Sequence, residues 1–414
     1  MRRVTCCSSV FVPAHCFEID SMSTATPSAP ASAPSAPVAV YDKGLANTIV
    51  ADTQMSFIDG AKGVLEYVGI DIDTLARNST YEETVYLLWN TKLPNNAELQ
   101  ALKSALQAEY EIPQGLYEMI RGMPKDAVPM HALRTLVSAL ALHDPEADLD
   151  GIDASKRKAL RLVAKTPTLI ANFDRYRSGK EFVRPNASFD IATNFLWMLN
   201  GEKPTDAMAR GLDICLILHA DHGLNASTFA GRVTIATLSD LYSAMTTAVG
   251  TLKGPLHGGA NEEVMIMLDE IGSMDKVESF VKGKLERKEL IMGFGHRVYK
   301  AYDPRATYLK TFAKQIATDT GNLNLFNMSQ GIEEIVLAAK ADKGIFPNVD
   351  FYSATTYHCL GIKTDLFTCM FAMSRMSGWC GHCIEQLQDN RLIRPQAKYT
   401  GPHAAPYVAT ADRR

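Results

Sequence analysis

Apolar residues recur at helical spacing along most of this chain, and that periodicity is what most restricts its fold. Segments 239–252, 261–272 and 371–388 repeat apolar side chains at i, i+3 and i+4, which places them on one face of a helix. The aligned residues are Leu241, Ala244, Met245, Ala248, Val249 and Leu252, then Val264, Met267, Leu268 and Ile271, then Met373, Met376, Cys380, Cys383 and Leu387. Neither βαβ alternation nor an internal repeat is visible. The sequence therefore predicts a mainly α fold.

One stretch near residue 60 departs from the helical pattern. In "MSFIDGAKGVLEYVGI" two short apolar runs flank a glycine-containing turn, which predicts a small N-terminal β-hairpin. Helical signals follow: Thr80 and Glu83 have capping-box spacing, and Pro94 precedes a second helix. The hairpin is the only β element that we expect.

Charge, hydropathy and cysteine content argue against several classes. The 414 residues carry a net charge of −4, so no overall positive field favours nucleic acid. No apolar run reaches the roughly 18 residues of a membrane span. Eight cysteines in so long a chain do not make a disulfide framework, which favours a reduced, cytoplasmic protein. Residues 1–37 include a Ser/Ala/Pro tract that cannot bury much apolar surface, so we expect a disordered or non-native extension there.

Three breaks between helical segments each place a histidine beside glycines. They are "HADHGLNAS" (219–227), "KGPLHGGANEE" (253–263) and "IMGFGHRVYK" (291–300). Glycine lets a ligand approach the backbone, and N–H groups exposed at a helix start favour anions. A single such histidine is more often a core or loop residue, but three together indicate a site for an anionic ligand. Zinc ligation by His219 and His222 is a weaker alternative, because no third ligand lies nearby in the sequence.

An aspartate and three arginines are further candidates. Asp350, in "FPNVDFYSATTYHCLGI", lies in an apolar setting, where it is either a helix cap or a partly desolvated base. Arg305 follows an Asp-Pro pair, Arg375 lies in a helix, and Arg394 precedes a proline. Arginine forks bind carboxylates in a bidentate manner, although a solvated surface arginine is the usual alternative.

The letters "WCGHC" (379–383) match the signature of thiol–disulfide oxidoreductases. That chemistry needs the first cysteine exposed at a helix N-terminus after a strand, where its thiolate is stabilised. Cys380 instead lies inside a periodic helix that begins well before Arg375. We interpret the match as a coincidence and keep oxidoreductase activity as a remote alternative.

Six motifs together carry a family resemblance. They are "SFIDGAKGVLEYVGIDIDTLA", "HADHGLNASTFAGRV", "GPLHGGANEEV", "IMGFGHRVYKAYDPRA", "PNVDFYSA" and "DNRLIRPQAKYTG". In this order, between residues 41 and 401, they resemble the citrate synthase family, and within it the short dimeric type. The resemblance implies a two-domain helical homodimer that closes over its substrates. It places the large domain at 38–257 and 362–414 and the small domain at 258–361.

The resemblance also implies a reaction and residue roles. The family condenses the methyl carbon of acetyl-CoA onto the ketone of oxaloacetate and then hydrolyses the thioester to citrate and CoA. On the matching positions, Asp350 is the implied base, His257 hydrogen-bonds the thioester oxygen, and His296 polarises the ketone. The implied oxaloacetate ligands are His222, Arg305, Arg375 and the partner subunit's Arg394. The implied CoA contacts are Ile291, Met292, Gly293, Phe294, Gly295 and Lys300.

The resemblance leaves the acyl group open. 2-Methylcitrate synthases share nearly all these motifs and accept propionyl-CoA. "YSATTYHCLGI" departs from the "YSG" form common in citrate synthases, with Ala354 and the pair Tyr357–His358 closer to the methylcitrate enzymes. Citrate synthase is our first interpretation because it is the commoner activity of the family. A non-catalytic acyl-CoA sensor is a remote alternative that the intact catalytic set disfavours. No metal or redox cofactor is implied.

Overall fold

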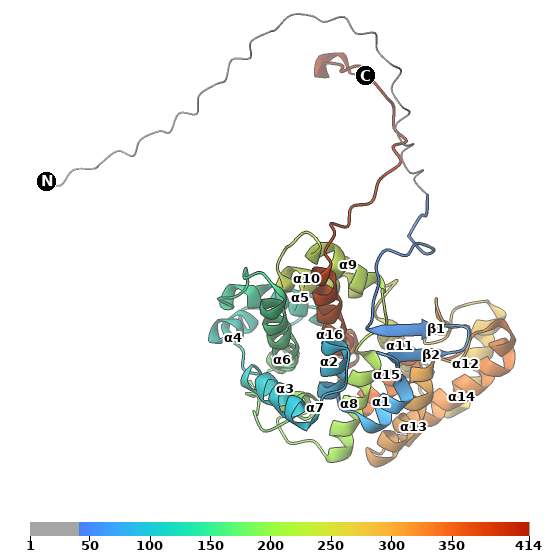
Figure 1. Cartoon of the computed structure of the whole chain (residues 1–414). Coiled ribbons are helices and arrows are strands. Elements are labelled where there is room, and N and C mark those ends of the chain that lie inside the picture. Colours follow the sequence, from blue (N-terminus) through green and yellow to red (C-terminus); the bar gives the residue numbers. More distant parts are fainter. Residues whose placement is uncertain (1–40, 414) are drawn as a thin grey trace, which may run out of the picture. The chain divides into compact units, whose positions relative to one another are not determined.

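A computed structural model describes residues 41–413, so the prediction for residues 1–37 lies outside the described part of the chain. Residues 53–413 form sixteen α-helices and one three-stranded sheet (Figure 1), which confirms the predicted mainly α fold. The strands are β1 (Ser56–Asp59), β2 (Val64–Tyr67) and β3 (Ile70–Asp71). The helices are α1 (Ile72–Asn78), α2 (Tyr81–Asn90), α3 (Asn96–Ala108), α4 (Gln114–Arg121), α5 (Pro129–Leu140), α6 (Ile152–Arg177), α7 (Ile191–Asn200), α8 (Asp206–His219), α9 (Ala226–Ile235), α10 (Leu241–Leu252), α11 (Ala260–Ile271), α12 (Met274–Glu286), α13 (Pro304–Asp319), α14 (Leu323–Lys340), α15 (Val349–Cys359) and α16 (Phe367–Gln388). Residues 41–52 form a separate short unit of turns.

The predicted hairpin is confirmed, and a third short strand extends it. β1 and β2 pair antiparallel with Ser56 opposite Tyr67, and β3 pairs antiparallel with β2. Val68 and Gly69 both take positive φ between β2 and β3, which turns the chain back within two residues. The two-residue length of β3 explains why no alternating pattern announced it.

The predicted helix signals are confirmed where the structure tests them. Thr80 and Glu83 form a complete capping box at the start of α2. The helix expected after Pro94 is α3, capped by Asn95. The apolar faces predicted for α10 and α11 are buried in full, and α11 ends at Gly272 in a left-handed conformation.

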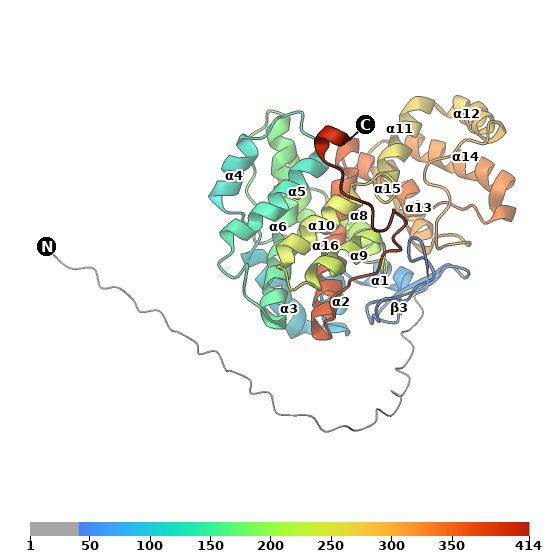
Figure 2. The same ribbon diagram turned by 90° about the horizontal axis from the view of Figure 1, so that it is seen from above.

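Helix α16 lies at the centre of the helical packing. It packs against α2, α5, α6, α8, α9, α10 and α11, and it is the red helix among them in Figures 1 and 2. The predicted apolar stripe is present, but the helix is buried almost all round, with Arg375 and His382 inside as well. A buried charge requires a partner or a ligand, so Arg375 and His382 are candidates for a functional site.

Helices α11 to α15 pack mainly on one another. α13 packs against α15, α12 against α14, and α11 against α15. They form the yellow-to-orange group in Figures 1 and 2. All five lie within the range predicted for the small domain, and the division into two domains stays a prediction.

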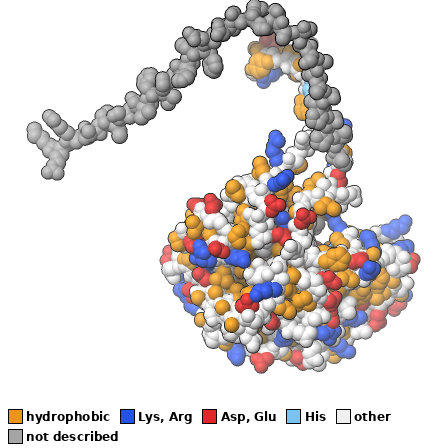
Figure 3. Space-filling view, in the orientation of Figure 1, with side chains coloured by type: hydrophobic (Ala, Val, Ile, Leu, Met, Phe, Trp, Pro, Cys, Tyr) orange, Lys and Arg blue, Asp and Glu red, His pale blue; other side chains and the backbone are white. Residues whose placement is uncertain are grey.

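The surface and the helix lengths give two further observations. Acidic and basic side chains are interspersed over the face shown in Figure 3, in keeping with the net charge of −4. Between residues 41 and 413, no helix has both the length and the apolar character that crossing a membrane requires.

Candidate active site

The turn between α8 and α9 carries the first histidines of the site. α8 ends at His219, Gly223 takes a left-handed φ of 57°, and the Asn225 side chain caps α9 by accepting the N–H of Thr228 at 3.1 Å. Glycine adopts that φ without the steric cost that a Cβ brings. The sharp turn points His222 inward, where its exposed fraction is 8%.

His222 and His296 meet beside one tyrosine. Their ring centroids lie 5.3 Å apart, and His222 Nε2 lies 3.1 Å from the hydroxyl of Tyr299. His296 Nδ1 accepts the backbone N–H groups of Val298 and Tyr299 at 3.1 and 3.2 Å, so the proton of the neutral ring lies on Nε2. Burial lowers the pKa of His296 to about 4 and that of His222 well below its usual value. Both rings are therefore neutral at pH 7.

His257 follows α10 and is held through its Nε2 atom. That nitrogen accepts the backbone N–H of Ser227 at 3.2 Å and lies 2.8 Å from its hydroxyl oxygen, which accepts Trp379 Nε1–H at 3.0 Å. Because Nε2 accepts, the proton of the neutral ring lies on Nδ1. Burial and then the charge of Arg375 lower the pKa of His257 to about 4. The ring thus presents a single N–H donor at pH 7.

Asp350 lies in the first turn of α15 but does not cap it. The cap is Asn348, whose side chain accepts the Asp350 N–H at 3.0 Å, so the capping alternative for Asp350 is wrong. Within residues 41–413 the Asp350 carboxylate has no hydrogen-bond donor of its own. Burial raises its pKa to about 6, against the opposing pull of Arg305 and Arg375. The carboxylate has the properties of a general base.

The two buried arginines differ in how they are paired. Arg305 donates from Nε and Nη2 to the Asp303 carboxylate at 3.0 and 2.8 Å. Arg375 donates from Nε to the backbone oxygen of His219 at 2.6 Å, and within residues 41–413 it has no carboxylate within ion-pair distance. Burial lowers its pKa to about 10. An unpaired buried guanidinium is suited to an anionic ligand.

Arg375 is also the charge on which the other candidates converge. It contributes to the lowered pKa of His222 and of His257, in both cases after burial, and it opposes the rise at Asp350. These three residues come from three separate segments of the chain. All three therefore lie within range of the charge of one guanidinium, and Arg305 also acts on His222 and Asp350.

The predicted CoA segment, 291–295, is a glycine-rich turn fastened to the start of α15. Gly293 and Gly295 have φ of 80° and 84°. Asn348 donates its N–H to the Gly293 oxygen, and Gly295 donates its N–H to the Phe346 oxygen, both at 2.9 Å. This turn is therefore held next to Asp350, and the N–H of Gly295 is already used.

Two of the predicted basic residues lie at the surface. Lys300 is exposed, and its backbone N–H donates to the Gly60 oxygen at 2.8 Å. Arg394 is exposed in the extended segment that follows α16. Within the described chain, the hydrogen bonds of residues 392–413 all stay inside that segment. Arg394 is therefore not part of the cluster in its own chain.

The cysteines of "WCGHC" lack the environment that thiol exchange needs. Cys380 and Cys383 lie in the second half of α16, both are buried, and neither forms a disulfide. Burial raises the pKa of Cys383 to about 12 and that of Cys380 well above its usual value. A reactive cysteine requires the opposite shift.

Comparison with known proteins decides the family. Residues 44–396 match the sequence model of the family described as citrate synthase, C-terminal domain. The chain belongs to the citrate synthase family. Citrate synthase 2 of Bacillus subtilis is 51% identical over 90% of this chain and 99% of its own length. Citrate synthase of Deinococcus radiodurans is 48% identical over 90% of this chain and 98% of its own.

Solved structures of the family share the fold. Citrate synthase from Pyrobaculum aerophilum superposes with a TM-score of 0.85, at 40% identity, over 89% of this chain and 95% of its own. Citrate synthase from Thermoplasma acidophilum, solved in a ternary complex with carboxymethyl coenzyme A and oxaloacetate, superposes with a TM-score of 0.84. It is 34% identical over 89% of this chain and 98% of its own.

Sequence reasoning missed the residues that hold the histidines. Ser227 and Tyr299 contact them directly and Trp379 does so through Ser227, yet none belongs to a pattern that reveals such a role. The capping role of Asn348 could have been predicted, because an asparagine just before a helix is a frequent N-cap. The zinc alternative at His219 and His222 finds no support, since no three potential metal ligands cluster within residues 41–413.

Proposed function

We propose that this chain condenses acetyl-CoA with oxaloacetate and water, and releases citrate and CoA through an enol or enolate. The observation that carries the proposal is one arrangement: Asp350, a carboxylate of raised pKa, and His257, a neutral N–H donor, converge around Arg375. Family membership and the relatives named citrate synthase support the same reaction.

In the first step, Asp350 removes a proton from the methyl group of acetyl-CoA. A pKa of about 6 makes it a stronger base than an ordinary aspartate and leaves it ionised at pH 7. The electron pair of the C–H bond moves toward the thioester carbonyl, whose oxygen gains charge. His257 stabilises that charge by donating from Nδ1, the nitrogen left free by Ser227.

In the second step, the enol carbon attacks the ketone of oxaloacetate. His222, Arg305 and Arg375 hold the oxaloacetate dianion. The guanidinium of Arg375, which has no carboxylate partner among the described residues, can donate to one of its carboxylates. His296 donates from Nε2 to the ketone oxygen as a new C–C bond forms and that oxygen takes up a proton. Water then hydrolyses the thioester of the product, which yields citrate and CoA.

We further propose a homodimer with composite sites, in which the partner subunit's Arg394 completes the oxaloacetate site. Its support is the segment 392–413, which carries an exposed Arg394 and forms hydrogen bonds only within itself among the described residues. We propose that the backbone at 291–295 and Lys300 bind CoA, and that 258–361 moves as a small domain. The five free, buried cysteines of the described chain support a reducing, cytoplasmic location.

The purified chain tests the activity directly. Release of the CoA thiol from acetyl-CoA is followed with a thiol reagent, with and without oxaloacetate. We expect release that requires oxaloacetate and persists in excess EDTA, because no step above needs a metal. A chain that releases no CoA with either acyl group would contradict the proposal and favour the sensor.

The acyl group is decided by the same assay with propionyl-CoA beside acetyl-CoA. Ala354 and Tyr357 are buried, whereas His358 is exposed. Of the three residues that resemble the methylcitrate enzymes, only Ala354 and Tyr357 are therefore buried. We expect the higher kcat/KM with acetyl-CoA, and a higher value with propionyl-CoA would assign 2-methylcitrate synthesis instead.

A further inference from the structure

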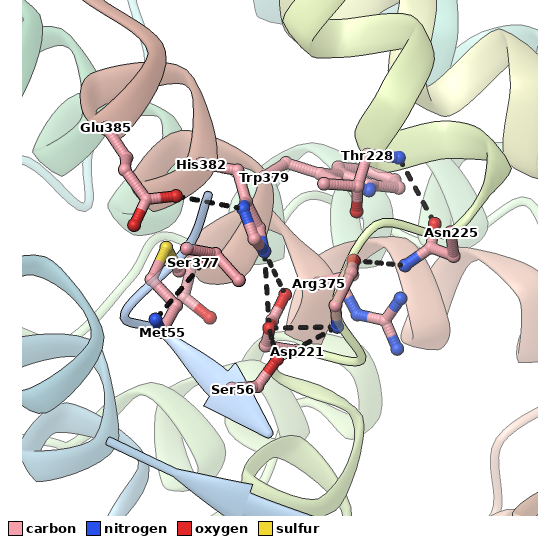
Figure 4. Close-up of polar contacts among 12 residues, drawn as sticks. Met55, Ser56, Asp221, Asn225, Thr228, Arg375, Ser377, Trp379, His382 and Glu385 are labelled. Carbon is pink, nitrogen blue, oxygen red and sulfur yellow. Dashed lines mark hydrogen bonds and ion pairs between the residues drawn. The ribbon is translucent and has the colours of Figure 1, made fainter. Parts of the chain in front are cut away.

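Trp379 and His382, the two large side chains of "WCGHC" besides the cysteines, face the candidate active site. Trp379 and His382 are three residues apart on α16, so they share a face, and Glu385 continues it one turn later. Trp379 reaches Ser227, which holds His257. His382 reaches Asp221, the residue that precedes His222 (Figure 4). The second contact has no place in the mechanism above.

Asp221 is the residue that fixes the His222 turn. Its carboxylate accepts the Ser56 hydroxyl at 2.7 Å and the Gly223 N–H at 3.1 Å, and it lies 3.2 Å from His382 Nε2. The Asp221 carboxylate therefore bonds the backbone of Gly223, and His222 lies between these two residues. Ser56 begins β1, so the same carboxylate ties the hairpin to the turn.

The packing of α16 brings it unusually close to this turn. Gly378 is the residue of closest approach, because a Cβ there would lie 2.3 Å from the Ala220 oxygen and 2.7 Å from Asp221 Oδ1. Asp221 and His382 are both fully buried. A buried carboxylate at this position requires a charged partner.

The groups around His382 show which charge it carries. Nε2 faces Asp221, while Nδ1 lies 3.6 Å from Glu385 Oε2, which accepts Arg232 Nη1–H at 2.9 Å. Nδ1 also lies 3.3 Å from Arg232 Nη1, and as an imidazolium it directs its proton toward Glu385 and accepts nothing from Arg232. With a neutral His382, Asp221, Glu385 and Arg232 leave a net charge of about −1, which the charge of Arg375 would have to balance. An imidazolium balances these three groups without Arg375. The Tyr67 hydroxyl bonds the backbone of Asp221 and not its carboxylate.

We propose that His382 is a positioning residue for oxaloacetate binding: as an imidazolium it neutralises Asp221, and through Asp221 it holds His222 and leaves Arg375 free for the substrate. Without that charge, Asp221 relies on Arg375 for compensation and competes with the oxaloacetate carboxylate for the same guanidinium. This inference rests on the proposed function.

The pKa of His382 supports the charge state. Burial opposes protonation, but Asp221 and Glu385 outweigh it and raise the pKa to about 9. With a pKa of about 9 the folded chain carries the imidazolium almost in full at pH 7 and loses it as pH rises through about 9. Arg375, whose pKa burial lowers to about 10, titrates nearby, so a variant must separate the two groups.

The test is the Kd of oxaloacetate, measured by calorimetry between pH 7 and 10, for the wild type and for His382→Gln. Glutamine keeps an N–H donor for Asp221 and removes the charge. We expect its Kd at pH 7 to rise on the order of tenfold, as for one partly screened charge near a dianion. We also expect the step near pH 9 to disappear, while kcat at saturating oxaloacetate is retained. His131→Gln, at an exposed histidine of α5, is the matched control and should behave as wild type.

A second variant guards against misfolding. Ser56→Ala removes one donor to Asp221 but keeps the imidazolium, so its Kd should rise only a few fold and its step near pH 9 should remain. An unchanged Kd in folded His382→Gln overturns the positioning role, as does a wild-type Kd that stays flat from pH 8 to 9.5. A wild type that binds no oxaloacetate at pH 7 overturns the proposed function and this role with it.

Discussion

Arg375 and Arg305 are equally buried, yet the structure predicts opposite effects on stability when each is replaced by methionine. Their exposed fractions are 1% and 2%. Asp303 neutralises Arg305 with two hydrogen bonds, whereas Arg375 has no carboxylate partner among residues 41–413. Arg375 is therefore a buried charge that no carboxylate of the described chain neutralises at ion-pair distance.

The magnitude follows from the pKa of Arg375. Burial lowers it from 12.5 to about 10, and at about 1.4 kcal/mol per unit this destabilises the folded chain by about 3 kcal/mol. A cation with a lowered pKa imposes this cost at every pH below about 10, so it is present in full at pH 7. Loss of the 2.6 Å bond to the His219 oxygen offsets about 1.5 kcal/mol. Arg375→Met should raise the free energy of unfolding by about 1–2 kcal/mol.

Calorimetric melting converts these energies into temperatures. An unfolding entropy of about 2.1 cal/mol/K per residue over roughly 370 residues makes 1 kcal/mol worth about 1.3 °C. Arg375→Met should then melt about 1–3 °C above wild type. Arg305→Met leaves Asp303 buried and unpaired, which costs about 3–5 kcal/mol, so it should melt about 4–6 °C below wild type.

Oxaloacetate gives the second readout. At 100 times its Kd it should raise the wild-type Tm by about 3–4 °C, because binding adds about 2.7 kcal/mol. Arg375→Met should lose most of that shift. If Arg375→Met melts several degrees below wild type, the guanidinium is stabilising and the reasoning fails. If oxaloacetate still stabilises it as much as wild type, Arg375 does not bind the substrate.

Four further predictions concern the base, its pH dependence, the thiols and the assembly. Asp350→Asn should fold and bind oxaloacetate but lose about 10²–10⁴-fold in kcat, and near-normal turnover would remove it from the mechanism. Since the pKa of Asp350 is raised to about 6, the wild-type kcat/KM for acetyl-CoA should fall tenfold per pH unit below that value, and a profile flat to pH 5 would contradict this. Replacing both Cys380 and Cys383 with serine should leave condensation measurable, and insulin reduction by the wild type would revive the oxidoreductase alternative. Mixing Arg394→Ala with Asp350→Asn should give heterodimers more active than either parent, since one site carries both lesions and the other none. Confirmed heterodimers of folded parents without recovery would refute the shared site.

The sequence allowed the helices and the reacting side chains to be predicted, for two different reasons. Helical periodicity is local, so α10 and α11 bury the faces that the pattern indicated. The candidate residues came from motifs, and the structure brings His222, His257 and Asp350 around Arg375. Neither route assigns a role by itself, and the roles remain proposals.

What could not be predicted depends on contacts between distant segments. The protonated nitrogen of His257 is set by Ser227, thirty positions earlier in the chain, and that of His296 by two backbone N–H groups of a folded turn. The pKa of Asp350 depends on burial, which one sequence does not report. These are tertiary properties, and no local pattern encodes them.

The sequence of helix α16 nevertheless contains a pattern that indicates a buried site. "WCGHC" draws attention to two buried cysteines, but Arg375, Trp379 and His382 stand at i, i+4 and i+7. That spacing puts three polar or amphipathic side chains on one stripe of a helix whose other faces are apolar. A solvent-facing stripe would leave one face of α16 exposed, yet the helix packs against seven others and all three residues are buried. A polar stripe on a helix that is otherwise apolar all round therefore predicts a buried, charged site rather than a surface. Gly378, beside the stripe, marks where another backbone approaches. Here Arg375 supplies a buried guanidinium, Trp379 donates to the serine that holds His257, and His382 faces Asp221, the residue before His222.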